Sequence, residues 1–221
     1  SFAEVFSLGN TYNNETWANR HIEMVKALAL VDTDAISKCN FTVAVDGINS
    51  VGGEIIPMLL RSLGVNNIIE INCESTGNFA HTPEPIPQNL TEISDVMRKT
   101  GADVGFVVDP DVDRLAIVME NGEMFVEENT LVAIADYVLS HTPGSTVSNL
   151  SSSRGLRDVT RSHGCEYSAA AVGEVNVVTK MKEVSAIIGG EGNGGIIYPE
   201  LHYGRDALVG VALFLTLMAK S

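Results

Sequence analysis

Three aspartates at alternate positions form the densest group of potentially reactive side chains in this sequence. Asp109, Asp111 and Asp113 lie in the string DPDVDR, which is flanked by apolar runs at 104–108 and 115–119. Side chains two residues apart in an extended backbone point the same way, so the three carboxylates should converge. At an effective dielectric of about 20 and a spacing of about 4 Å, each carboxylate pair costs about 4 kcal/mol. A bound cation would offset this repulsion.

The ligand types indicate which cation would bind. The cluster offers carboxylate oxygens, and no His or Cys lies within the string. Oxygen donors favour a hard ion, with Mg²⁺ first and Mn²⁺ or Ca²⁺ next. Mg²⁺ keeps coordination positions for water and for a phosphate oxygen, which suits phosphoryl transfer. We therefore predict a magnesium site at Asp109, Asp111 and Asp113.

Three other interpretations of the aspartates remain open. The string could be a solvated acidic turn between two strands, although turns favour Gly and Asn. It could be a calcium loop of EF-hand type that ends at Glu120, but Arg114 stands where that loop needs glycine. It could also belong to a magnesium-dependent phosphatase of haloacid dehalogenase type. That family places Thr or Val where this chain has Asp113.

A glycine-rich segment, IIGGEGNGGIIY at 187–198, is the second candidate site. No helix pattern follows it and no GK[ST] is present, so a nucleotide-binding loop is excluded. Glycines let the backbone approach a ligand closely, and Glu191 and Asn193 could then bind neighbouring hydroxyls of a sugar. The alternative is a glycine-rich connection without a ligand.

Short apolar runs alternate with helical patterns along the chain, which predicts mainly parallel mixed sheets covered by helices. Predicted helices are 16–30, 51–63, 91–99, 127–140, 153–162, 174–182 and 206–218. Predicted strands are 41–45, 67–71, 104–108, 145–150, 167–172 and 186–188. The turn signal Asn121-Gly122 separates the halves. The expected fold class is therefore α/β, with two tandem α/β/α domains at 1–126 and 127–221.

Charge and cysteine content restrict the partners. The formal net charge of −14 disfavours nucleic acid and anionic membrane surfaces. The three cysteines lie far apart, which favours a reducing, cytoplasmic setting, and no apolar run is long enough to span a membrane. An anionic substrate would need local cations. Arg154 and Arg205 are candidates, although a solvated surface side chain is the favoured interpretation of each, and His202 is expected to be an ordinary loop histidine.

These residues together resemble the α-D-phosphohexomutase superfamily, whose members have four domains. The metal loop of domain two, DGDGDR, is matched by DPDVDR, and the sugar loop of domain three, GEXSG, is matched by Gly190 to Gly194, with Asn193 in place of Ser. Three further matches are VDGINSVGG at 45–53, PEPIPQNL at 83–90 and GRDAL at 204–208. The likeness covers nearly the whole chain.

The resemblance implies a reaction that interconverts hexose 1-phosphate and hexose 6-phosphate through a phosphoserine and a bisphosphate. Asp109, Asp111 and Asp113 would then hold Mg²⁺ together with a phosphoserine oxygen. Arg114 would contact the substrate or the phosphoserine, or would only pair with the aspartates. Glu191 and Asn193 would bind the sugar in both of its orientations. Neither the preferred sugar nor the general acid and base is assigned, since Glu174 stands where some members have His.

Two strings of the superfamily do not occur in this sequence. The phosphoserine loop of domain one resembles TASHNP, and the phosphate clamp of domain four resembles RxSGTEP; both are missing. We therefore expect a piece covering domains two and three, inactive alone, with no catalytic residue of its own and with domains one and four as partners. A complete phosphatase and a calcium-binding module without chemistry are the competing functions.

Overall fold

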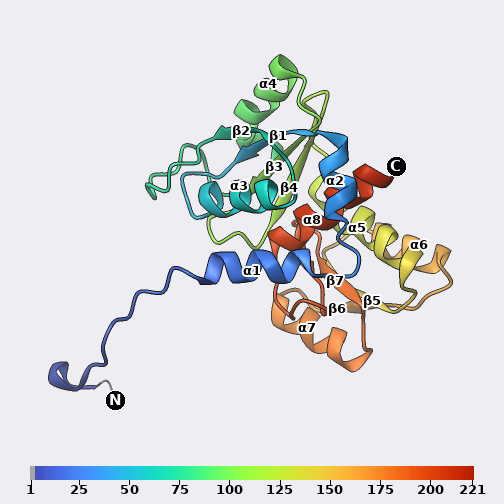
Figure 1. Cartoon of the computed structure of the whole chain (residues 1–221). Helices are drawn as coiled ribbons and strands as arrows, with labels where there is room; N and C mark the ends of the chain where they lie inside the picture. The colour runs from blue at the N-terminus through green and yellow to red at the C-terminus, as the bar shows by residue number, and fades with distance from the viewer. Residues whose placement is uncertain (1–2) are drawn as a thin grey trace.

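The computed structural model describes residues 3–221, in which the alternating apolar segments form two four-stranded sheets (Figure 1). The first sheet has the order β2-β1-β3-β4, with β1 at Thr42–Asp46, β2 at Asn67–Ile71, β3 at Val104–Val108 and β4 at Leu115–Met119. The second has the order β6-β5-β7-β8, with β5 at Thr146–Asn149, β6 at Tyr167–Ala170, β7 at Ile188–Glu191 and β8 at Gly195–Ile197.

Both sheets have the same mixture of strand directions. In the first, β1 is parallel to β2 and β3, and β4 runs antiparallel to β3. In the second, β5 is parallel to β6 and β7, and β8 runs antiparallel to β7. Each antiparallel pair is joined by a short loop, at 109–114 in the first sheet and at 192–194 in the second. The predicted fold class is confirmed, and both loops of interest occupy equivalent places in the two sheets.

Helices cover the sheets and link them. They are α1 at Trp17–Lys26, α2 at Thr33–Cys39, α3 at Gly52–Ser62, α4 at Thr91–Thr100, α5 at Glu127–His141, α6 at Gly155–Ser162, α7 at Glu174–Glu183 and α8 at Ala207–Lys220. Two short 3₁₀ helices lie at Val5–Ser7 and Pro87–Asn89. No helix in the described part of the chain combines the length and apolar character needed to cross a membrane.

Helix α8 holds the two sheets together, because it is apolar on every side and contacts α1, α2, α5 and β4 as well as β8. Residues 207–216 are all buried. Phe214 packs edge-on against Phe106 of the first sheet and against Phe125 beside the turn between the halves. One continuous core therefore contains side chains from both sheets, which fixes the position of one loop relative to the other.

Two local predictions were wrong. The helix predicted at 16–30 ends at Lys26, and a second helix begins at Thr33 because the carboxylate of Asp32 accepts the N–H of Ala35. The helix predicted at 153–162 begins at Gly155, and Arg154 occupies the N-cap position of α6 without a side-chain hydrogen bond. The Ser153 hydroxyl, outside the helix, accepts the N–H of Gly155 at 3.2 Å.

Candidate functional site

The aspartate loop lies between the end of β3 and the start of β4. One carboxylate oxygen from each of Asp109, Asp111 and Asp113 lies within 4.8 Å of the others. Asp109 is buried, Asp113 is partly buried and Asp111 is exposed. Val112 adopts a left-handed conformation with φ of +61°, which is rare for a β-branched residue. The loop thus brings the predicted ligands together at one turn.

Asp109 is the most heavily bonded of the three. Its Oδ1 accepts the backbone N–H of Asp113 at 3.0 Å and of Arg114 at 3.1 Å, and its Oδ2 lies 2.6 Å from Arg114 Nε. Burial alone would raise the pKa of Asp109, but the side-chain and backbone hydrogen bonds from Arg114 outweigh it, so the pKa lies below its ordinary value. Asp109 is a fixed anion.

Asp113 has the opposite character. Burial and the neighbouring charge of Asp109 raise its pKa to about 7. Its Oδ2 pairs with Arg205, whereas its Oδ1 is buried without a hydrogen-bond partner. A buried oxygen left unpartnered is costly, and a hard cation would supply the missing contact. The donor set and this unpartnered atom both fit a divalent ion of the Mg²⁺ type.

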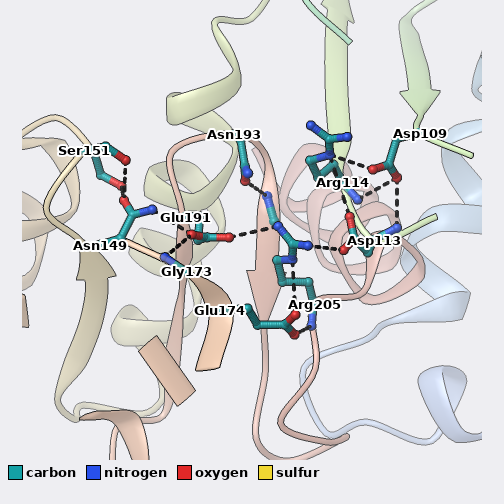
Figure 2. A network of polar contacts seen from close by, with 12 residues as sticks. Asp109, Asp113, Arg114, Asn149, Ser151, Gly173, Glu174, Glu191, Asn193 and Arg205 are labelled. Carbon is teal, nitrogen blue, oxygen red and sulfur yellow. Dashed lines mark hydrogen bonds and ion pairs between the residues drawn. The ribbon is translucent and has the colours of Figure 1, made fainter. Parts of the chain in front are cut away.

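The glycine-rich segment forms the turn between β7 and β8. The Glu191 carboxylate is buried, and it accepts Asn149 Nδ2 at 2.7 Å, Arg205 Nη1 at 2.8 Å and the N–H of Gly173 at 3.4 Å. Asn193 accepts the N–H of Gly195 with its Oδ1 at 3.2 Å, which tightens the turn. Figure 2 shows these side chains beside those of the aspartate loop.

The two loops are joined by main-chain contacts. Leu115 donates its N–H to the carbonyl of Gly194 at 3.1 Å, and Arg114 forms an isolated antiparallel bridge with Gly195. Gly194 has φ of +87°, and an added Cβ would lie 2.3 Å from the Leu115 oxygen. Only glycine allows this close approach.

A small cavity opens where the loops meet. It has a volume of about 210 Å³, and its walls include Arg114, Asn193, Glu84 and Glu128. Arg114 comes from the aspartate loop, Asn193 from the glycine-rich loop and Glu84 from the proline-rich segment after β2. Three of the segments singled out in the sequence therefore contribute to one cavity.

Family models match the two halves of the chain in order. Residues 19–122 match the phosphoglucomutase/phosphomannomutase α/β/α domain II, and residues 127–221 match the α/β/α domain III of the same family. The chain belongs to the phosphoglucomutase/phosphomannomutase family. It is accordingly a member of the α-D-phosphohexomutase superfamily, as the sequence motifs suggested.

Individual relatives agree. A phosphoglucomutase/phosphomannomutase from Thermococcus kodakarensis is 34% identical over 91% of this chain and 44% of its own length. A probable phosphoglucosamine mutase from Methanopyrus kandleri is 30% identical over 95% of this chain and 46% of its own length. The chain thus spans about half the length of the curated phosphohexomutases that it matches.

Solved structures show the same arrangement. A phosphoglucomutase/phosphomannomutase family protein from Burkholderia thailandensis superimposes with a TM-score of 0.81 at 29% identity, over 92% of this chain and 44% of that one. A putative phosphomannomutase from Thermus thermophilus gives 0.84 at 26% identity, over 91% of this chain and 47% of that one. The alternative of a haloacid dehalogenase-type phosphatase finds no support in these comparisons.

Sequence reasoning underestimated Arg205 and His202. Arg205 contacts both phosphohexomutase loops, whereas Arg154 is an exposed residue before α6. The signal was present in the GRDAL motif, because Asp206 of that motif caps α8 and so fixes its neighbours. Asp206 Oδ1 accepts the N–H groups of Leu208 and Val209.

A second cluster, His21, His202 and Asp206, has ligand atoms close enough to hold a metal, but its hydrogen bonds argue against one. Both imidazole Nε2 atoms lie against Asp206 Oδ2, at 2.7 Å for His21 and 2.9 Å for His202. His202 Nδ1 accepts the N–H of Gly204, so the proton sits on Nε2, which then has no lone pair for a metal. The cluster ties α1 to the start of α8.

Proposed function

We propose that this chain is the metal-binding and sugar-binding part of a phosphohexomutase that interconverts hexose 1-phosphate and hexose 6-phosphate. The observation that carries the proposal is the main-chain contact between Leu115 and Gly194, which holds the aspartate loop against the glycine-rich loop. Membership of the phosphoglucomutase/phosphomannomutase family supports the same reaction. A phosphorylated hexose is the expected substrate.

In this proposal Asp109, Asp111 and Asp113 hold Mg²⁺. When bound, the ion withdraws charge from the transferring phosphate. The two ends of the loop contribute differently, because Asp109 is held ionised by Arg114 and Asp113 keeps one oxygen without a hydrogen-bond partner. Asp111 is exposed and can turn toward an ion without breaking a buried contact.

The sugar would bind at the cavity between the two loops. Arg114 lines this cavity together with Glu84, Glu127 and Glu128. An anionic substrate would therefore have to draw on the charge of Arg114, which is paired with Asp109, and on a bound metal ion. The Asn193 amide lines it from the other side. Glu191 does not line this cavity, and its buried carboxylate is held by three donors. A sugar hydroxyl that reached Glu191 would replace one of these contacts, of which the N–H of Gly173 is the longest at 3.4 Å. Binding of two neighbouring hydroxyls by Glu191 and Asn193 would be compatible with both orientations of the sugar ring.

The phosphate itself would come from a phosphoserine outside this chain. A sugar hydroxyl attacks the phosphorus and loses its proton, the new P–O bond forms, and the bond to the serine oxygen breaks. The serine oxygen takes up a proton, which gives a free serine and a hexose bisphosphate. After the sugar turns around, its other phosphate returns to the serine. In this proposal the serine and the phosphate clamp belong to domains one and four of a longer mutase.

The metal site is tested by unfolding the chain thermally with increasing Mg²⁺. Binding to the folded state should raise the midpoint. Asp111→Ala should leave stability without Mg²⁺ within about 0.5 kcal/mol, because Asp111 is exposed, and should abolish the response. Asp136→Ala, at another exposed aspartate, is the matched control and should keep it. An equal response in Asp111→Ala, or none in the unmodified chain, would refute the site.

The reaction class is tested with a chimera, in which the 203 matched residues replace their counterparts in the Thermococcus kodakarensis relative. The chimera should convert glucose 1-phosphate to glucose 6-phosphate in a coupled assay, and Asp111→Asn should remove that activity. The chain alone should release no phosphate from p-nitrophenyl phosphate with Mg²⁺. A folded, metal-binding chimera without turnover, or steady hydrolysis by the chain alone, would contradict the proposal.

A further inference from the structure

The guanidinium group of Arg205 lies between the two phosphohexomutase loops and contacts carboxylates from three elements (Figure 2). Its Nη2 pairs with Asp113 of the aspartate loop, and its Nη1 lies 2.8 Å from Glu191 Oε2. Its Nε lies 3.7 Å from Glu174 Oε2, near enough for an ion pair but too far for a hydrogen bond. The guanidinium group therefore forms ion pairs with three carboxylates.

The backbone around Arg205 fixes this placement. Arg205 forms an isolated antiparallel bridge with Ile197, and its own N–H is donated to Glu174 Oε1 at 3.0 Å. Gly195 makes room for the side chain, because an added Cβ would lie 2.4 Å from Arg205 Cδ. The Arg205 side chain is only 18% exposed, so it cannot relax into solvent without opening the site.

The contact with Asp113 uses one carboxylate oxygen and leaves the other free. Oδ2 faces Arg205, while Oδ1 is buried without a hydrogen-bond partner and lies 3.7 Å from Arg114 Nε. Since Arg114 is bonded to Asp109, Oδ1 faces the part of the loop where the aspartates converge. Arg205 thus holds Asp113 by one oxygen, and the other oxygen stays free on the side where the aspartates converge.

We propose that Arg205 is a positioning residue that couples the metal loop to the sugar loop, orienting Asp113 for the metal and Glu191 for the sugar at the same time. This inference rests on the proposed function. Ligands of metals are held by such outer contacts, whose loss weakens metal binding by about 10- to 100-fold. Simple electrostatics predicts the opposite effect on metal affinity. Removing the positive charge of Arg205 should strengthen the binding of a metal cation nearby.

The test is Mn²⁺ binding to the whole chain, measured by electron paramagnetic resonance with Mg²⁺ as competitor. Arg205→Gln should weaken Mn²⁺ binding about tenfold or more. Arg205→Lys, which keeps the charge but cannot reach both loops, should weaken it in the same direction. Arg157→Gln, which removes an arginine from an ion pair with the exposed Asp158, is the control and should bind as the unmodified chain does.

A double-mutant cycle distinguishes coupling from charge. Glu191→Gln should weaken Mn²⁺ binding several-fold when Arg205 is present and should have no effect in the Arg205→Gln background. A pure charge effect of Glu191 would persist in both backgrounds. Circular dichroism confirms folding of each variant, and if Arg205→Gln does not fold, Arg205→Lys replaces it in the cycle.

Three results would overturn the inference. Tighter or unchanged Mn²⁺ binding in the folded Arg205 variants would show that Arg205 does not position the ligand. Equal effects of Glu191→Gln in both backgrounds would remove the coupling. No Mn²⁺ binding by the unmodified chain would refute the proposed metal site, and the inference with it. Normal binding by the unmodified chain with either of the first two results would refute only the role of Arg205.

Discussion

Arg114 donates two hydrogen bonds to the carboxylate of Asp109. One comes from its side-chain Nε at 2.6 Å and the other from its backbone N–H at 3.1 Å. The carboxylate of Asp109 is 1% exposed and the Arg114 side chain 26%. The pair therefore shapes the turn between β3 and β4 whether or not a metal is bound. This role is separate from metal binding, and it can be measured as stability.

Asp109→Asn should destabilise the chain by about 1–3 kcal/mol, because the amide keeps one acceptor and turns an N–H₂ group toward donors. The partial relief of repulsion with Asp113 keeps the loss below that of a typical broken buried pair. The measurement is urea unfolding without metal. Asp95→Asn, at an exposed pair with Arg98, should change stability by less than about 0.5 kcal/mol. Equal losses in both variants would contradict the structural role of Asp109.

Gly194→Ala should be much more harmful than Gly164→Ala. Both glycines have positive φ, +87° and +69°, so each substitution carries strain of about 1–2 kcal/mol. At Gly164 an added Cβ meets nothing within 4 Å, whereas at Gly194 it would lie 2.3 Å from the Leu115 carbonyl oxygen. Urea unfolding of both variants isolates the cost of that clash. Similar losses would mean that the two loops are not held in contact.

The contribution of His21 to stability should depend on pH. Its hydrogen bond to Asp206 raises the pKa of His21, while burial acts against this. The pKa of Asp206 falls to about 2: burial opposes the change, but the hydrogen bonds from His202 and His21 prevail, so Asp206 remains an anion. Because the folded pKa of His21 is raised, its stabilising effect is full below about pH 6.5 and is lost as pH rises through the folded pKa.

Urea unfolding of the unmodified chain and of His21→Gln should therefore differ more at pH 5.5 than at pH 9. His202 faces the same carboxylate and is left unchanged in both proteins. His163→Gln, at an ion pair with the exposed Asp136, controls for loss of an imidazole at the surface. A difference that grows toward pH 9 would show that the pair with Asp206 does not stabilise the protonated imidazole.

Cys73 should resist alkylation while Cys39 reacts. Burial raises the pKa of the Cys73 thiol to about 11, so only about 0.1% is thiolate at pH 8. Cys39 is exposed at the end of α2. Iodoacetamide labelling followed by peptide mass spectrometry measures both rates in one sample. Faster labelling of Cys73 than of Cys39 would show that the segment after β2 opens.

Local patterns predicted the elements well where burial and periodicity agree. The strands at 67–71 and 104–108 have the predicted bounds. The second is a wholly buried apolar run, whereas the first has three isoleucines among the exposed Asn67 and Glu70. The three aspartates were predicted to converge along extended backbone. The carboxylates do lie together, but residues 110–112 form a turn, so the convergence has a different cause. That they bind Mg²⁺ stays a prediction.

Long-range pairing could not be predicted from the sequence. Arg205 contacts Asp113, which lies 92 residues earlier in the chain, and nothing local to either residue indicates the other. The left-handed backbone at Val112 was also unforeseen, since a β-branched residue disfavours that conformation. It is tolerated because Val112 is buried and its carbonyl accepts the N–H of Ala207 at 3.1 Å.

The hydrogen bond between Leu115 and Gly194 uses peptide groups, which every residue at position 115 other than proline possesses. Exchange of side chains on either loop therefore leaves the spacing of the two loops intact, as long as position 194 stays glycine. Asn193 and the residues around the cavity can therefore vary without moving the aspartate loop relative to the glycine-rich loop. A main-chain link of this kind keeps the two loops aligned while the side chains around the cavity change.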